Sequence, residues 1–266
     1  MLLMPVFALL GLFTGSFLNV CIDRLPKGQS IIYPPSHCAT CNHKLGMLDL
    51  VPVFSYLWLR GHCRYCQDRI PLRIPIVEAT NGLLFTFLYW RLRPDWVELA
   101  IFLVYACLLT IIFVIDLENQ LVLNKVTYPG MALALAFSFL RPEIRTLSFF
   151  WPNIGVESSL AGGALGLLVV TLIAIIYPPG MGWGDVKLAA LVGLMTGFPL
   201  VIVALLLWWI SGGLVGLILL ALKIKKRKDP LPSATFLTIA AMVTLLWGRA
   251  IYWWYMNSIF YVKLKY

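Results

Sequence analysis

Two groups of residues in this 266-residue chain have the types and spacing needed for chemistry. One is a pair of Cys-x-x-Cys turns, Cys38 to Cys41 and Cys63 to Cys66, with 21 residues between them. The other is a pair of aspartates, Asp116 and Asp185, each beside an apolar run. Thiolates in this pattern predict a metal site, and paired carboxylates predict general acid–base chemistry.

The cysteine turns predict a structural zinc site. Two residues between thiolates let one turn present both sulfurs to one ion, and two such turns complete a tetrahedral Zn(II) site with no open position. A closed site of this kind has no catalytic role, but it stabilises a short segment with little core of its own. The alternative is a redox-active pair, which usually needs a low-pKa thiol in a thioredoxin-like setting that nothing here suggests.

The histidines of this segment and the two remaining cysteines are not expected to bind the metal. Three histidines of the same segment could replace a thiolate, but with four cysteines present we expect them to tune or solvate the site; they are His37, His43 and His62. Cys21 and Cys107 have no spaced partner, so we expect them to be small buried apolar residues.

The two aspartates form a candidate catalytic pair. Asp116 follows the run IFLVYACLLTIIFVI, and Asp185 lies in GMGWGDVKL. A single aspartate at a helix boundary often marks the membrane interface, whereas two at matched depth indicate a functional site. If they lie within hydrogen-bonding distance, they share one proton and titrate as a unit. Such a dyad can hold a water, with one carboxylate as base and the other as acid toward a peptide carbonyl.

Composition identifies an integral membrane protein, since 61% of residues are apolar and only 12% are charged. We therefore take the net charge of +9 as a signal of how the chain is oriented in the membrane, and we expect no nucleic-acid partner. The N-terminus has no positive residues ahead of its apolar run and is predicted to be a retained first helix rather than a signal peptide. Eight membrane-spanning helices are predicted, with seven or nine as alternatives: 2–20, 75–92, 97–116, 126–141, 157–177, 185–199, 200–222 and 231–250. The aromatic tail 251–262 either prolongs the last helix or lies in the interface.

Basic residues predict the orientation. When alternate loops are placed on opposite sides, one side collects fourteen Lys and Arg and the other seven. The first set is Arg24, Lys27, Lys44, Arg60, Arg64, Arg69, Arg73, Lys125, Lys187, Lys223, Lys225, Lys226, Arg227 and Lys228, and the second is Arg91, Arg93, Arg141, Arg145, Arg249, Lys263 and Lys265. The positive-inside rule puts the first set in the cytoplasm and the N-terminus outside. This assignment, made without the acids, brings Asp116 and Asp185 to the cytoplasmic face.

The fold prediction is an all-α polytopic membrane protein in three parts. Residues 1–20 form the first transmembrane helix, 21–74 a cytoplasmic four-cysteine zinc module, and 75–266 a transmembrane aspartic peptidase domain. Two clusters of small residues are expected to let helices pack closely: Gly162, Gly163 and Gly166, and Gly212, Gly213 and Gly216.

The motifs, in this order and spacing, resemble the type IV prepilin peptidase family of bifunctional leader peptidases and N-methyltransferases. The resemblance covers most of the chain and includes the two cysteine pairs and these segments: GSFLNVCIDRLPKGQSI (15–31), PVFSYLWLRG (52–61), PIVEATNG (75–82), IDLENQLVLN (115–124) and GMGWGDVKL (180–188). It implies that Asp116 and the Asp185 of the Gly-x-Gly-Asp motif are catalytic, and that the four cysteines bind zinc. Gly182 and Gly184 are expected to let the backbone bend and approach an extended substrate strand.

The same resemblance implies the substrate and the location. The substrate is a prepilin or pseudopilin whose short basic leader, ending in glycine, is removed at the cytoplasmic face of the bacterial inner membrane. The new N-terminus is then methylated with S-adenosylmethionine as donor. The lipid bilayer is the other expected partner, and the sequence does not indicate an oligomeric state.

The chain departs from the family pattern at two places. Leu123 and Asn124 stand where relatives commonly have Pro and Asp, and LPSATFL (231–237) replaces a segment close to PFGPFL. Lys187 matches a recurrent family lysine that could stabilise an ionised Asp185, although a topology anchor explains it nearly as well.

Two other classes of protein are weighed against a peptidase. A non-catalytic zinc-bearing assembly factor would keep its activity without the aspartates. A transporter would carry ionisable groups near the bilayer midplane within repeated halves, and neither feature is found in the sequence.

Overall fold

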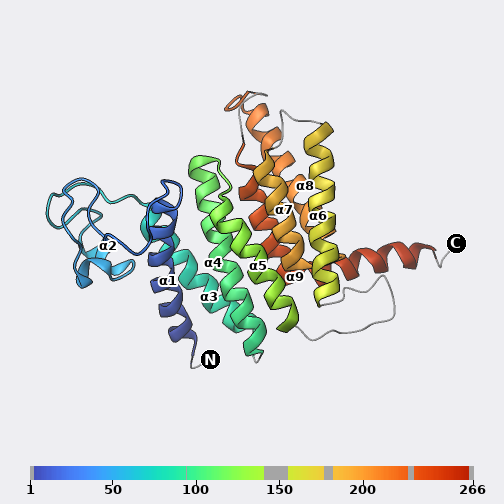
Figure 1. Cartoon of the computed structure of the whole chain (residues 1–266), viewed down its shortest axis with the longest axis horizontal. Helices are drawn as coiled ribbons and strands as arrows, with labels where there is room; N and C mark the ends of the chain where they lie inside the picture. Colours follow the sequence, from blue (N-terminus) through green and yellow to red (C-terminus); the bar gives the residue numbers. More distant parts are fainter. Residues whose placement is uncertain (1–2, 94, 141–154, 177–181, 227–230, 264–266) are drawn as a thin grey trace. The chain divides into compact units, whose positions relative to one another are not determined.

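The computed structural model describes residues 3–93, 95–140, 155–176, 182–226 and 231–263, with side chains described up to residue 258. Their regular structure is helical, apart from two isolated bridges. The elements are α1 Met4–Arg24, η1 Met47–Leu50, α2 Phe54–Trp58, α3 Arg73–Leu92, α4 Trp96–Asn119, α5 Asn124–Leu140, α6 Val156–Ile176, α7 Trp183–Thr196, α8 Leu200–Ala221 and α9 Ser233–Lys263 (Figure 1).

The eight longer helices coincide with the eight predicted runs, but only five of them are candidate membrane spans among the described residues. These are α1, α4, α6, α8 and the Ser233–Ser258 part of α9. The helix α5 has 17 residues and α7 has 14, fewer than the roughly 20 that a span needs. The helix α3 has 20 residues but includes Arg73, Glu78 and Arg91. The prediction of an all-helical chain is confirmed for this part of the protein, and the count of eight spans is not.

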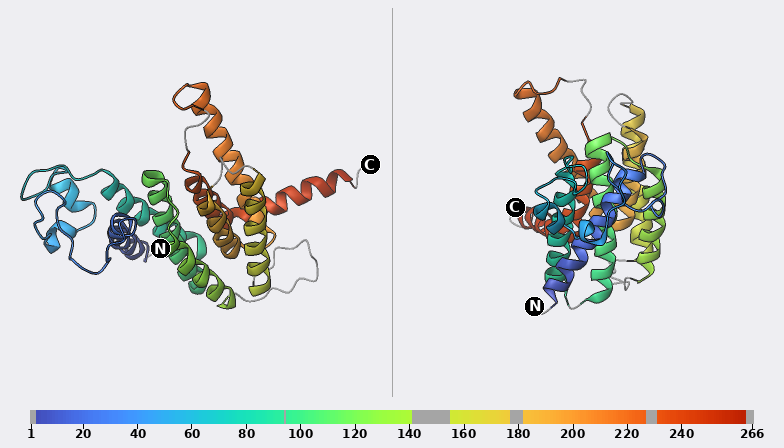
Figure 2. Two further views of the ribbon diagram at one scale, coloured as in Figure 1. Left: turned by 45° about the horizontal axis from the view of Figure 1, so that its top comes forward. Right: turned by 90° about the vertical axis from the view of Figure 1, so that its left-hand side faces the viewer.

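The aromatic tail prolongs the last helix, since α9 continues to Lys263. Figure 2 shows the C-terminal part of this helix extending away from the neighbouring helices. Several basic residues used for the topology prediction lie outside the described residues: Arg141, Arg145, Arg227, Lys228 and Lys265.

The chain divides into two compact units, Met1–Ile111 and Ile112–Tyr266, with the boundary inside α4. In unit 1, α1 and α3 pack along each other. Two glycines of α1 make the close approach possible, because a Cβ on Gly11 would lie 2.4 Å from the carbonyl oxygen of Asn81 and one on Gly15 would lie 2.8 Å from Cα of Glu78. The cysteine segment connects these two helices.

In unit 2, α7 contacts α5, α6, α8 and α9 (Figure 1). Most of its residues are buried, because it has neighbours on several sides. It begins after Gly182 and ends before Gly197, whose φ of 74° lies in the left-handed region that favours glycine. This central position is why so short a helix can hold the buried side chain of Asp185 in place.

The glycine clusters have different outcomes. A Cβ on Gly162 would lie 2.4 Å from the carbonyl oxygen of Gly193, so the first cluster does bring α6 and α7 into close contact as predicted. The second cluster has a mixed outcome. A Cβ on Gly216 would lie 3.3 Å from Cδ1 of Leu231, which is a close contact, whereas a Cβ on Gly213 would meet no atom within 4 Å among the described residues. Gly212 has only ordinary contacts, with Phe236 at 3.7 Å.

Candidate functional site

The cysteine segment folds into two turns with the same hydrogen bonds. In the first turn, Asn42 N–H donates to Cys38 O at 3.0 Å and Cys38 N–H to His43 O at 3.0 Å. In the second turn, Gln67 N–H donates to Cys63 O at 3.0 Å and Cys63 N–H to Asp68 O at 2.8 Å. Asn42 and Gln67 follow the second cysteine of each turn and have positive φ values of 54° and 59°.

The four sulfur atoms converge. The Sγ atoms of Cys38, Cys41, Cys63 and Cys66 all lie within 4.8 Å of one another, and those of Cys38 and Cys66 are 3.8 Å apart. A tetrahedron with Zn–S bonds of about 2.3 Å has edges of about 3.8 Å, so this donor set fits Zn(II). No histidine joins this group in the described part of the chain. His43 instead lies against the ring of Tyr65, with 3.6 Å between ring centroids.

The turns also favour a metal-binding thiolate. The backbone N–H groups of Cys41 and then Thr40 lower the pKa of the Cys38 thiol to about 6. A hydrogen bond from the Asp68 backbone lowers the pKa of the Cys66 thiol, but burial and the neighbouring cysteines outweigh this bond and raise that pKa to about 12. The turns therefore favour one thiolate, at Cys38, and a bound metal ion would be needed to hold all four sulfurs ionised. The Thr40 hydroxyl donates to the carboxylate of Asp68 in the other turn. This hydrogen bond is the main reason why the pKa of Asp68 is lowered, and it ties the two turns together.

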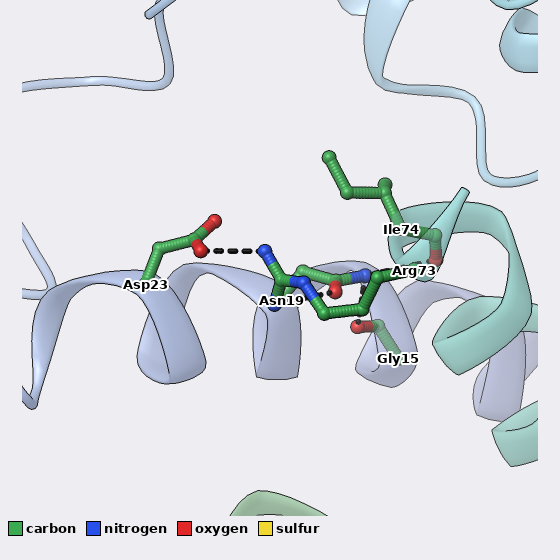
Figure 3. Close-up of polar contacts among 5 residues, drawn as sticks. All are labelled: Gly15, Asn19, Asp23, Arg73 and Ile74. Atoms are coloured by element: carbon green, nitrogen blue, oxygen red, sulfur yellow. Dashed lines mark hydrogen bonds and ion pairs between the residues drawn. The ribbon is translucent and has the colours of Figure 1, made fainter. Parts of the chain in front are cut away.

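The base of the cysteine segment is closed by polar contacts between α1 and α3 (Figure 3). Arg73 donates to Asp23 at 2.5 Å and to the side-chain oxygen of Asn19 at 3.4 Å. The Asn19 amide donates in turn to the carbonyl oxygens of Ile74 at 3.1 Å and Gly15 at 3.3 Å. Both ends of the segment therefore leave the helix pair at the same place.

Glu78 is a buried acid for which no role was predicted from the sequence. Only 5% of it is exposed, and its Oε2 accepts a hydrogen bond from Val53 N–H at 2.7 Å. The Ser16 side chain also bonds to this carboxylate. A glutamate inside the apolar run PIVEATNG was a visible signal, because a carboxylate in a predicted span needs partners.

In unit 2, the two candidate aspartates converge on the beginning of α9. Asp116 comes from the last turns of α4 and Asp185 from the first turn of α7, and they are 4% and 9% exposed. Oδ2 of Asp116 accepts hydrogen bonds from Thr235 N–H at 2.7 Å and from the Thr235 hydroxyl at 2.9 Å. Asp185 shares a hydrogen bond with the Ser233 side chain and lies close enough to Asp116 for electrostatic interaction.

Sequence reasoning missed Ser233 and Thr235 as partners of the aspartates. Their signal was weak, because hydroxyl residues at a helix start are ordinarily interpreted as caps. They do lie in LPSATFL, one of the two segments where the chain departs from the family pattern. The free N–H groups of a helix start also attract negative charge, so α9 suits a carboxylate here.

The two glycines of the Gly-x-Gly-Asp motif differ in their surroundings. A Cβ on Gly184 would lie 2.9 Å from Cβ of Val122, so this position has no room for a side chain. A Cβ on Gly182 would have Gly184 N as its nearest neighbour, at 3.9 Å. Gly182 caps α7, and its carbonyl oxygen accepts a hydrogen bond from Asp185 N–H at 3.0 Å.

The Lys187 side chain contacts Asn124 and Tyr128 rather than pairing with Asp185. Its Nζ donates to Oδ1 of Asn124 at 2.9 Å and lies 5.5 Å from the centre of the Tyr128 ring. Asn124 is the first residue of α5 and one of the departures from the family pattern. The lysine thus joins the start of α5 to α7 beside the Asp185 turn.

These features define a helical membrane protein with a four-cysteine module and a buried pair of carboxylates. The chain belongs to the type IV leader peptidase family. Residues 9–92 match the bacterial peptidase A24 N-terminal domain, and residues 103–217 match the type IV leader peptidase family. The first match includes all four cysteines, and the second includes Asp116 and Asp185.

Two curated relatives match over nearly their whole length. The chain is 31% identical to a prepilin leader peptidase/N-methyltransferase of Aeromonas salmonicida, over 94% of this chain and 93% of the relative. It is 30% identical to a protein of that name from Pseudomonas putida, over 91% and 90%. No solved structure matches. The family resemblance and the prediction of a peptidase are confirmed.

Proposed function

We propose that this chain is an aspartic endopeptidase that removes the basic leader of prepilins or pseudopilins after glycine, and that it methylates the new N-terminal residue. The prepilin substrate and the methylation are supported by the names of the relatives. The aspartic mechanism is supported by one observation above all. Asp116 and Asp185 come from different helices, are both buried, and interact at the start of α9.

The proposed reaction uses the two carboxylates and one water. An ionised aspartate takes a proton from the water as the water oxygen attacks the carbonyl carbon of the leader glycine. The other aspartate donates its proton to the carbonyl oxygen. When the C–N bond breaks, the departing amine receives the proton that the first aspartate took from the water. One hydroxyl of the intermediate returns a proton to the second aspartate, so the leader ends in a carboxyl group and the pair regains its starting state. Thr235 directs two donors to one oxygen of Asp116, so we assign the negative charge to Asp116 and the shared proton to Asp185.

The proposed topology keeps the predicted arrangement. Eight helices would cross the inner membrane with the N-terminus outside, and the zinc module at 21–74 and the aspartates of the peptidase domain at 75–266 would lie at the cytoplasmic face. The excess of basic residues on the same side supports this orientation. The shorter helices α5 and α7 would be accommodated by local thinning of the bilayer.

The two implied cofactors differ in their fit. The four cysteines would hold Zn(II) in a closed structural site that supplies stability rather than chemistry. For S-adenosylmethionine, the described residues offer no strand, glycine-rich turn and helix of the Rossmann type. We therefore assign no residue to the methyl donor and derive no step through it.

The test is cleavage of a purified prepilin by the full chain in detergent or nanodiscs. Asp116→Asn and Asp185→Asn should each reduce kcat by at least about a thousand-fold, because each removes the proton acceptor or donor. Glu157→Gln is the matched control, since it removes an exposed carboxylate of unit 2 at the start of α6.

Retained cleavage in either aspartate variant would contradict the dyad. If the wild-type chain cleaves no prepilin while pilus assembly needs the chain but not its aspartates, the assembly-factor alternative would replace the proposal. Zinc content and thermal stability of each variant separate a loss of chemistry from a loss of fold.

A further inference from the structure

The cysteine segment carries an exposed apolar surface that the peptidase proposal does not use. Between residues 47 and 58, six large apolar side chains are exposed by 40% or more: Met47, Leu48, Leu50, Phe54, Leu57 and Trp58. Met47 and Trp58 are 91% and 85% exposed. Soluble proteins rarely expose several large apolar side chains close together unless these side chains form a binding site.

The two short helices that carry these side chains lie in contact. Phe54, Leu57 and Trp58 are spaced i, i+3 and i+4 on α2, so they share a face. Tyr56 lies on another side of α2 and packs against Gly61, where a Cβ would lie 2.8 Å from the tyrosine hydroxyl. The helix α2 also contacts η1, which carries Met47, Leu48 and Leu50. We call these six residues the α2–η1 surface.

One hydrogen bond sets the depth of this surface along the helix pair. Val53 directly precedes α2, and its N–H is held by Glu78. Glu78 is five residues beyond Arg73, the first residue of α3, which is a rise of roughly 7–8 Å along the helix. The helix α2 therefore begins beside the first two turns of α3, and α3 packs against the candidate span α1. Glu78 lies level with Gly15 of α1, because a Cβ on Gly15 would lie 2.8 Å from Cα of Glu78, and Gly15 precedes Arg24, the last residue of that candidate span, by nine residues. The helix α2 thus begins within the length of α1.

The charge of the segment suits an anionic lipid surface. Residues 21–74 contain seven basic and three acidic residues. Each acid has a partner in this described segment: Asp23 pairs with Arg73, Asp49 with Arg64, and Asp68 with Thr40. The basic residues outside these two ion pairs are Arg24, Lys27, Lys44, Arg60 and Arg69.

We propose that the α2–η1 surface lies in the headgroup region of an anionic bilayer and anchors the cysteine module to the membrane. Apolar side chains with a nearby tryptophan and basic residues are typical of helices that lie in the interface. Anionic headgroups attract the unpaired basic residues within a Debye length. This inference is independent of the proposed peptidase chemistry.

The test measures the depth of position 58 in the full chain. Because the chain has six cysteines, the nitroxide label is attached to p-acetylphenylalanine placed at position 58, with position 39 as control. Ala39 is exposed in the first cysteine turn, away from the α2–η1 residues in sequence. In nanodiscs containing phosphatidylglycerol, accessibility to oxygen and a water-soluble nickel complex should place position 58 roughly 5–10 Å below the phosphates. Position 39 should remain in water.

A second set of variants, which removes basic residues, tests whether the surface prefers anionic lipids. Lys44→Gln with Arg60→Gln should remove the difference in depth between phosphatidylglycerol and phosphatidylcholine nanodiscs. Arg93→Gln, at the opposite end of α3, should not change it. Equal water accessibility at positions 58 and 39 in every lipid would overturn the proposal. So would a position 58 that is shielded only after a prepilin is added, because the surface would then bind protein rather than lipid.

Discussion

The cysteine module of unit 1 and the carboxylate pair of unit 2 are built in opposite ways. The module is made of two turns within one continuous segment, and each turn brings its own two cysteines together. The carboxylate pair is assembled from the end of α4, the start of α7 and the start of α9. A metal site can therefore be recognised from local spacing, whereas the carboxylate pair depends on helix packing.

The first prediction is that a substitution in one region should leave the property of the other region unchanged. Cys63→Ser removes a buried ligand and should reduce the zinc content from about one ion per chain to a small fraction, because three thiolates no longer close the site. Asp116→Asn and Asp185→Asn should leave zinc content unchanged. Metal analysis by mass spectrometry, with Cys107→Ala as the control outside the cluster, measures this difference.

The Cys63→Ser variant also tests whether the module contributes to methylation. We expect transfer of a radioactive methyl group to a precut pilin to be lost with the zinc. Methylation that survives in a folded, zinc-free variant would remove the module from that activity.

The second prediction concerns the packing that places Asp185. Gly184→Ala adds a methyl group that would meet Val122 at 2.9 Å, so the start of α7 must shift. A displacement of about 1 Å at a catalytic group can reduce the rate about a hundred-fold, and a loss of ten- to a hundred-fold in kcat is expected. Gly182→Ala is the matched control, because its nearest atom would be 3.9 Å away.

Val122→Ala offers a direct check on this explanation. In combination with Gly184→Ala it makes room for the added methyl group, and it should recover part of the lost activity. If Gly182→Ala is as harmful as Gly184→Ala, backbone freedom rather than close packing is the reason for the motif.

The third prediction concerns the hydroxyl that holds Asp116. Thr235→Val keeps the shape and the backbone N–H but removes one of the two donors at 2.7 and 2.9 Å. The loss of one hydrogen bond to a charged group should lower kcat about ten-fold. Thr235→Ser keeps the hydroxyl and should remain near the wild-type rate. Equal rates for the two variants would show that the hydroxyl does not matter.

The difference between the local cysteine module and the assembled carboxylate pair also explains which parts of the two sites could be predicted from the sequence. The four cysteines and their geometry could be inferred, because Zn(II) needs a small set of ligands at short spacing. Asp116 and Asp185 could be paired only through the count of basic residues and the family resemblance. Their contacts with Ser233 and Thr235, and that of Glu78 with Val53, could not be inferred, since tertiary packing decides which hydroxyl or N–H reaches a carboxylate.

Helix boundaries show a similar limit. Apolar runs located the eight longer helices, but the length of α7 depends on Gly182 and Gly197 at its ends. Its 14 residues are mostly buried, so its apolar character reflects contact with other helices as much as with lipid. Hydropathy alone does not distinguish these two environments.

The smallest expected effect lies next to the carboxylate pair, at the departure from the family pattern. Asn124→Asp places a carboxylate where Lys187 Nζ already lies 2.9 Å from the Asn124 oxygen. A partly exposed ion pair contributes little, so we expect a rise in Tm of about 1–3 °C and cleavage within about two-fold of wild type. The same substitution with Lys187→Gln should give no rise, since the double-mutant cycle isolates the pair. A fall in cleavage of more than ten-fold would instead show that a third carboxylate near Asp185 disturbs the proton shared by the dyad.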